Sequence, residues 1–449
     1  MEVHKMKYTT YIIVLTVSLA TVSCSGLFNK NPFEGKKGNE ITQVYTRAVT
    51  AIKDSEETPQ EKAERFALLG QSALETPRSA HLAIVAFEEA LKLDATNAKA
   101  NFYSALLLPL LSLKGVSIRM AEIVTPKYAQ EATESILKGI RRMDIRSVVS
   151  DFLKDEKAGE VFKTLSELQQ FMTGQLLATL EESERRLEIV SKDSSFKVTF
   201  NYENWGYAKL HTLNPFNTTV TLDQIEVKSA KTAMKGMAVW VKIAASYNLD
   251  DALALRDKYL SKDKASLKHM TFRDVVEDLK QHPKLLTLNA NGADLLKSAR
   301  ENISQAVEST KIIANMIGTN DAEREGKLIP AFGKYEDYAG CRVGSCMVDD
   351  ILSGPVAVPV GQHKNHENEK YKERTVLVDG TVIFYHPISD LKALLPTEFD
   401  ASGKLAKSFP DVTFGGMVPN GDLLSTYCST ADKAKNFDLP IECSKATQK

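Results

Sequence analysis

The sequence predicts a mainly α-helical protein, built of antiparallel, repeat-like helical hairpins, with a smaller β-containing C-terminal module that bears disulfides. Three observations support this fold class. Apolar residues recur every three to four positions over much of 41–320. Gly, Pro, Val and Cys become more frequent after Gly318, and four of the five cysteines lie in the last quarter of the chain. The length of 449 residues favours two or three domains.

The charge balance bears on the class of partner. The chain has 57 Lys and Arg against 58 Asp and Glu, which gives a formal net charge of -1. Nucleic-acid-binding proteins carry a basic face, and so do proteins drawn to anionic lipid. We therefore expect no nucleic-acid partner.

Residues 1–23 have the features of an export signal. A weakly basic start is followed by the apolar stretch YIIVLTVSLA at 11–20. That stretch is too short to cross a bilayer core of about 30 Å as a finished helix. No other apolar run in the sequence approaches the length of a membrane span. We expect 1–23 to be a signal peptide that is removed.

The end of this segment, Thr21-Val22-Ser23-Cys24, resembles the cleavage site of bacterial lipoproteins, at which signal peptidase II cuts before a diacylglycerol-bearing cysteine. The family prefers an aliphatic residue where Thr21 stands. The resemblance implies that Cys24 carries the lipid, palmitate included, and that the membrane is a partner through this anchor. Ser25 is similar to the sorting pattern for the outer membrane, which implies an envelope protein facing the periplasm. Residues 24–40 are polar and predict a lipid anchor and flexible tether.

The helical body is expected over 41–320, and its densest signal lies at 80–93. There Ala83, Phe87 and Ala90 share one face at helical spacing, and a second helix opens after a short turn. Small residues around one aromatic let two helices approach closely.

This pattern resembles a tetratricopeptide repeat over roughly 64–108, with Leu69-Gly70 near the usual Leu-Gly of the first helix. Such a repeat needs stacked neighbours, and the resemblance implies a surface that holds a protein, peptide or small ligand. A plain helical bundle is the alternative. Further helices are expected at 128–153, 156–191, 225–249, 250–260, 271–281 and 290–318.

One insertion interrupts the helices, at 196–223. Aromatic and β-branched residues alternate with polar ones there, which predicts a short strand pair or an ordered loop. Its aromatic residues Trp205, Tyr207 and Phe216 are candidates for a ligand site, although core packing is the better interpretation.

The C-terminal module is expected over 321–449 as an α/β unit. Its clearest local signal is Asp379-Gly380 between two β-rich runs, which predicts a hairpin over 374–385. With Cys24 set aside for the lipid, an even set of cysteines remains. These are the disulfide candidates Cys341, Cys346, Cys428 and Cys443.

Pairing each of these cysteines with its nearest neighbour is one of three possible connectivities. A four-thiolate zinc site is the alternative, but fourteen residues between Cys428 and Cys443 fit zinc spacing badly. We expect no metal.

The string FPDVTFGGMVPNGD at 409–422 resembles the closing segment of an uncharacterised set of secreted bacterial proteins that begin with helical repeats. The matching residues are Pro410, Asp411, Thr413, Phe414, Gly415, Gly416 and Pro419. The preceding stretch ISDLKALLP, the helix at 237–251 and the helix start Asn291-Gly292-Ala293-Asp294 agree with that set. The resemblance implies no activity, and we interpret the string as structural.

The sequence contains no nucleophile elbow, zinc-protease helix, phosphate-binding glycine loop or dinucleotide fingerprint. We therefore expect no catalytic residues and no cofactor, although scattered catalytic groups leave the enzyme question open. The leading hypothesis is a non-enzymatic envelope lipoprotein whose body binds a protein, peptide or small ligand. The alternatives are a hydrolase-like enzyme, with its site between body and C-terminal module, and a purely structural envelope protein.

Overall fold

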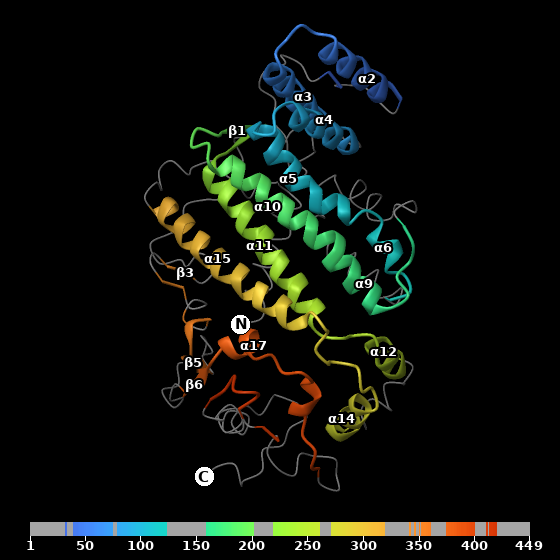
Figure 1. The fold of residues 1–449 in the computed structure, drawn as a ribbon, viewed down its shortest axis with the longest axis vertical. Coiled ribbons are helices and arrows are strands. Elements are labelled where there is room, and N and C mark those ends of the chain that lie inside the picture. The colour runs from blue at the N-terminus through green and yellow to red at the C-terminus, as the bar shows by residue number, and fades with distance from the viewer. Residues whose placement is uncertain are drawn as a thin grey trace.

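The structure, a computed structural model, is mainly helical, and its described residues form only small two-stranded sheets (Figure 1). The described residues are 32–33, 39–74, 79–123, 159–201, 219–260, 271–318, 341–342, 345–346, 350, 352–360, 374–399, 410–411 and 413–419. The signal segment 1–23, Cys24, the expected helix 128–153, Cys428 and Cys443 lie outside them.

The helices of the N-terminal part are α2 (Asn39–Lys53), α3 (Pro59–Leu74), α4 (Ala80–Leu93), α5 (Ala98–Ser112) and α6 (Val116–Arg119). The central helices are α9 (Leu165–Phe171), the π-helix η1 (Met172–Leu176), α10 (Leu177–Ser191), α11 (Gln224–Ser246), α12 (Ala252–Leu260), α14 (Phe272–Lys280) and α15 (Gly292–Gly318). The C-terminal part holds α17 (Thr381–Tyr385) and the 3-10 helix η5 (Leu391–Leu394).

The strands pair in antiparallel twos. They are β1 (Val198–Asn201) with β2 (Thr219–Leu222), β3 (Cys341–Arg342) with β4 (Ser345–Cys346), and β5 (Val356–Val360) with β6 (Arg374–Val378). The first pair lies within the insertion at 196–223.

Three long helices, α10, α11 and α15, run side by side through the molecule (Figure 1). The helices α2 to α4 stack at one end of this layer, and α12, α14 and α17 lie at the other. Helix α11 packs against both α10 and α15, so it is the central element of the body.

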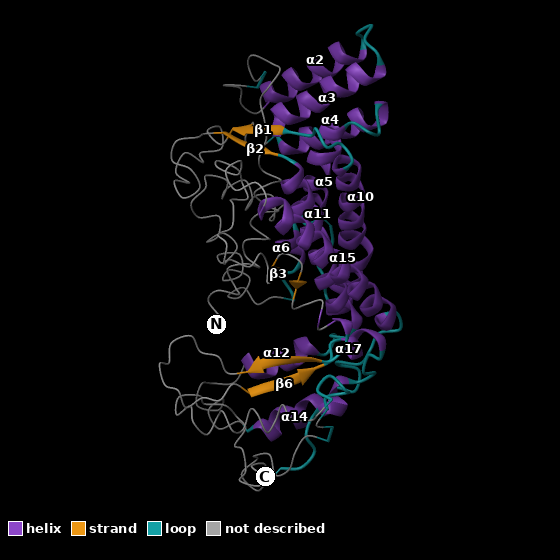
Figure 2. Cartoon of the chain, turned by 90° about the vertical axis from the view of Figure 1, so that its left-hand side faces the viewer, coloured by secondary structure: helices purple, strands orange, loops and turns teal. Residues whose placement is uncertain are grey.

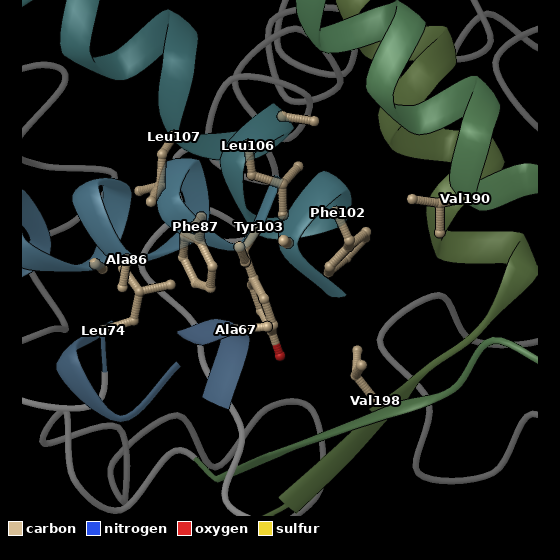
Figure 3. Close-up of a cluster of buried hydrophobic side chains, with 14 of the residues drawn as sticks. Ala67, Leu74, Ala86, Phe87, Phe102, Tyr103, Leu106, Leu107, Val190 and Val198 are labelled. Carbon is tan, nitrogen blue, oxygen red and sulfur yellow. The ribbon is translucent and has the colours of Figure 1, made fainter. Parts of the chain in front are cut away.

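The largest core joins the repeat-like hairpin to the long helices (Figure 3). The ring of Phe87 stacks on Tyr103 with centroids 5.3 Å apart, and Phe102 lies 5.2 Å from Phe196. Val190 of α10 belongs to the same cluster. The N-terminal hairpins therefore share one hydrophobic core with the central layer.

The close approach of α3 and α4 has a visible cause. Ala83, Phe87 and Ala90 are all 0 % exposed. A Cβ added to Gly70 would stand 2.6 Å from the Phe87 ring, so the absence of a side chain there lets the ring reach α3. The following helix opens at Ala98, where the Asn97 side chain accepts a hydrogen bond from the Ala100 amide.

A charged seam runs along the three long helices. The Lys235 ammonium, on α11, donates to Glu184 of α10 and to Gln305 of α15. Lys242 donates to Ser298 at 2.9 Å. Both lysines are 4 % exposed, so their ion pairs and hydrogen bonds offset the cost of burial and help to fix the helix register.

The prediction of a hairpin over 374–385 is wrong. Strand β6 pairs with β5, upstream of it, and Thr381–Tyr385 is helical. A tight hairpin turn of Asp-Gly type needs positive φ at both central residues, whereas Gly380 has φ -72°. The Asp379 carboxylate instead accepts hydrogen bonds from the Thr381 amide and hydroxyl, which form a turn just before the helix that begins at Thr381.

Two further findings differ from expectation. Phe33, in the segment expected to be a flexible tether, is 1 % exposed and belongs to the large core. In the described part of the chain, the helical stretch Ala98–Arg119 also has the length and apolar composition to cross a membrane. Because 56% of its most apolar window is buried inside the protein, we interpret it as a core helix.

Candidate functional site

Several stretches that stand out in the sequence meet at one place, which we call the junction: residues 244–250, 283–292 and 388–392. Their backbones form a small ladder. The Asn248 amide donates to Thr287 and the Leu286 amide donates back to Asn248, both at 2.8 Å. On the other side, the Leu288 amide donates to Ser389 at 2.8 Å. The junction therefore ties the end of α11 and the start of α15 to the C-terminal part.

The glycine of Asn291-Gly292-Ala293-Asp294 is explained by this packing. A Cβ at Gly292 would lie 2.3 Å from the Ser246 carbonyl oxygen, so only glycine lets the two helix ends touch. The Asn289 side chain adds a hydrogen bond of 2.9 Å to the Ala245 carbonyl, an otherwise open group at the end of α11.

The tail string packs on the same place. Gly415 has φ +70°, and a Cβ there would stand 2.5 Å from Ile388. The Asp411 carboxylate accepts hydrogen bonds from the Thr413 hydroxyl and from the Gly415 amide, both at 2.6 Å. These bonds lower the pKa of Asp411, chiefly through Thr413. The residues of Asp-x-Thr-Phe-Gly-Gly thus build a turn that fits the junction.

Three side chains complete the junction. Lys392, 8 % exposed, donates to the carbonyls of Pro283 and Leu285 and pairs with Asp390 at 2.9 Å. The Tyr247 hydroxyl donates to the Ile388 carbonyl at 3.1 Å, and burial raises the pKa of this tyrosine.

Gln169, from α9, caps the end of α11 at the edge of the junction. Its amide nitrogen donates at 2.7 Å to the carbonyls of Ala244 and Tyr247. These carbonyls lie at the helix end, where no further turn satisfies them.

The chemistry of the junction is that of a structural connection. Its buried polar groups bond to one another, and the nearest histidine, His282, lies 3.5 Å from Asp251 through Nδ1. Across the described ranges, no group of three His, Cys, Asp or Glu side chains could hold a metal ion. Nothing in this arrangement pairs a nucleophile with a base.

A different feature stands out on the surface, the outer face of α11. The Trp240 side chain is 68 % exposed, the most exposed large hydrophobic residue in the described part of the chain. One helical turn away on either side lie Gly236, whose Cβ position faces open space, and the exposed Ala244. The indole therefore projects between two small residues. We call this face the Trp240 face.

Sequence reasoning missed Trp240 and singled out other aromatics. Trp205, Tyr207 and Phe216 lie outside the described residues. The sequence carries only a partial signal, because Gly236 and Ala244, four residues before and after the tryptophan, are small while Met237 and Ile243, three residues away, are not.

The remaining sequence candidates are placed as follows. Ala83, Phe87 and Ala90 lie in the core, so they contribute packing and no surface. Cys341 stands opposite Cys346 in the β3–β4 pair. No family model, no curated protein and no solved structure matches the chain. The candidate site is therefore identified from the geometry of the structure alone.

Proposed function

We propose that the chain is an exported, lipid-anchored, non-enzymatic protein of the cell envelope whose helical body binds a protein partner. The observation that carries the proposal is the exposed indole of Trp240, 68 % exposed on the central helix of the body. Tryptophan is enriched at the energetic centres of protein interfaces, where a large ring fills a pocket of the partner.

The form of the Trp240 face favours a macromolecular partner. The ring is exposed on a helix, and the residues one turn before and after it, Gly236 and Ala244, are small enough to leave room for a partner. A projecting ring fits an apolar pocket on another protein, whereas small ligands are held in concave sites. The resemblance of residues 64–108 to a tetratricopeptide repeat agrees with a binding role.

A photocrosslinking amino acid at position 240, in the native envelope, tests this proposal. The matched control is position 85, because Val85 is also an exposed apolar residue, at 49 %, but lies on α4. We expect a discrete crosslinked product from position 240 that position 85 does not give. Equal products from both positions, or none from position 240, would contradict the proposal.

The lipid anchor is a separate part of the proposal and rests on residues 1–24. Globomycin, which inhibits signal peptidase II, and a Cys24→Ala variant should each prevent maturation of the lipoprotein. We expect Cys24→Ala to appear in the soluble fraction and to lose palmitate labelling. If the Cys24→Ala variant stays in the membrane fraction and keeps its palmitate label, Cys24 is not the lipid anchor.

We further propose disulfides Cys341–Cys346 and Cys428–Cys443. The register of β3 and β4 supports the first, because opposing residues in an antiparallel pair lie about 4.5–5.5 Å apart at Cα, within the range of a disulfide. The second pairing follows because Cys428 and Cys443 are the two cysteines that remain once Cys24 is assigned to the lipid and Cys341 to Cys346. Peptide mapping without reduction should recover both linked pairs; four alkylatable thiols in the unreduced protein would exclude them.

A further inference from the structure

Strands β5 and β6 form a two-stranded ribbon that projects away from the long helices (Figure 2). Within the part of the chain that the structure describes, no third strand joins this sheet. An isolated two-stranded sheet is marginally stable in water, and an unpaired strand edge is a template for strand addition. The question is which edge is open and what it binds.

Pro359 indicates which backbone N–H and carbonyl groups of β5 and β6 point away from the partner strand. Pro359 lies opposite Thr375. Because proline has no N–H, it fits a pair whose backbone groups point away from the partner strand. The backbone groups of successive residues point in alternate directions along a strand. The N–H and carbonyl of Leu377 therefore point away from β5, like those of Thr375. The amide of Asp379, two residues further, donates to the Met417 carbonyl at 2.8 Å, as this alternation requires.

The same alternation shows that the two edges differ. On the β5 side the outward positions are Pro355, Ala357 and Pro359, and two of these three have no N–H to offer. On the β6 side, Thr375 and Leu377 each present both an N–H and a carbonyl. The β6 edge is therefore the one fitted to accept a strand.

In the described stretch 413–419, the segment that meets Asp379 forms turns and no regular strand along this edge. Continued antiparallel pairing beyond Met417 would bring Pro419 opposite Leu377, and a proline cannot donate to its carbonyl.

We propose that the β6 edge binds the β6 edge of a second copy of this chain, antiparallel and centred on Val376. This register pairs Thr375 of each copy with Leu377 of the other, so every outward backbone group within the strand is bonded. Arg374 then stands opposite Val378 of the second copy, whereas a parallel, in-register arrangement would set the two arginines side by side. The contact is two-fold symmetric and builds a four-stranded sheet.

Cysteine crosslinking can test the geometry of the proposed sheet. The two Val376 positions would face each other at a non-hydrogen-bonded pair, about 4.5 Å apart at Cα. Val358, the ladder neighbour of Val376 on β5, makes a matched control. Its two copies would be three strand spacings apart, about 14 Å, which no disulfide spans.

The experiment uses the full-length chain carrying Val376→Cys or Val358→Cys, oxidised with copper phenanthroline and analysed on a non-reducing gel. We expect Val376→Cys to give several-fold more disulfide-linked dimer than the unsubstituted chain, and Val358→Cys to give no increase. Adding Thr375→Pro to Val376→Cys removes one outward N–H and should abolish the increase.

The proposal is overturned if Val376→Cys gives no increase while its circular dichroism and melting temperature match the unsubstituted chain. It is also overturned if Val358→Cys crosslinks as strongly. Neither result depends on the partner of the Trp240 face, which lies on another element.

Discussion

The α-carbon of Gly292 lies so close to the main chain of Ser246 that a Cβ at position 292 would stand 2.3 Å from the Ser246 carbonyl oxygen. The side chain of Leu288 closes the same space, at 2.7 Å. The end of α11 and the start of α15 thus touch backbone to backbone, and the C-terminal part is hydrogen-bonded to this contact.

Gly292→Ala should destabilise the protein. The obstructing atom is a backbone oxygen, so the helix ends must move apart, and overpacking of this kind costs about 1–3 kcal/mol. Chemical unfolding measures the change. Gly236→Ala is the matched control on α11, because no heavy atom lies within 4 Å of its Cβ position. We expect that variant to be stabilised by about 0.5–1 kcal/mol, since alanine favours a helix interior over glycine. Equal effects at the two sites would contradict the packing described.

Phe87→Ala should cost about 3–5 kcal/mol of unfolding free energy, because it removes a fully buried ring that stacks on Tyr103 and leaves a cavity. Val85→Ala, two residues earlier on α4 and 49 % exposed, should change stability by less than about 0.5 kcal/mol. Thermal unfolding of both variants provides the comparison, and a small loss for Phe87→Ala would show that α3 and α4 do not pack through this ring.

Lys392→Met should loosen the junction. The substitution keeps most of the aliphatic side chain but leaves the carbonyls of Pro283 and Leu285 without their donor, at about 1–3 kcal/mol for each group that stays buried. Hydrogen exchange should accelerate at the amides of Leu286 and Leu288. Lys297→Met, at an exposed position of α15, is the control and should leave these amides unchanged.

Glu182→Gln should destabilise the protein in a pH-dependent way. Hydrogen bonds from Arg185 and then Arg186 lower the pKa of Glu182 from 4.5 to about 2. A lowered pKa in the folded state means that the carboxylate stabilises the fold above pH 4.5 and that this contribution disappears as the pH falls towards 2. Urea unfolding from pH 7 to pH 2 should show the difference between variant and parent shrinking. A constant difference would contradict this role.

Much of the helical body was predictable because its signals are local. The spacing of Ala83, Phe87 and Ala90 predicts α4, and Asn97 lies where a cap is needed before α5. The junction was not predictable in this way. Gly292 and the tail string stood out in the sequence, but their meaning depends on contacts between segments that are far apart along the chain.

The error over 374–385 has a similar origin. A local rule joined two β-rich runs across Asp379-Gly380, while the real partner of β6 is β5, beyond a different loop. β-branched and aromatic residues predict a strand at Thr381–Tyr385, but the turn that Asp379 forms with Thr381 and the burial of Phe384 against the body favour a helix. Trp240 was missed because its exposure is a tertiary property.

The junction also sets the order in which the chain can complete its fold. The hydrogen bond from Tyr247 to Ile388 joins residues 141 positions apart, whereas the α3–α4 hairpin needs only contacts within a few dozen residues. Contacts of long sequence separation form late, because a large loop must close first. During synthesis the N-terminal hairpins can therefore fold early, while the end of α11 and the start of α15 complete their packing only when the last quarter of the chain is present. A chain that ends before Ile388 would keep the large N-terminal core and lose the hydrogen bonds that residues 388–392 contribute to the junction.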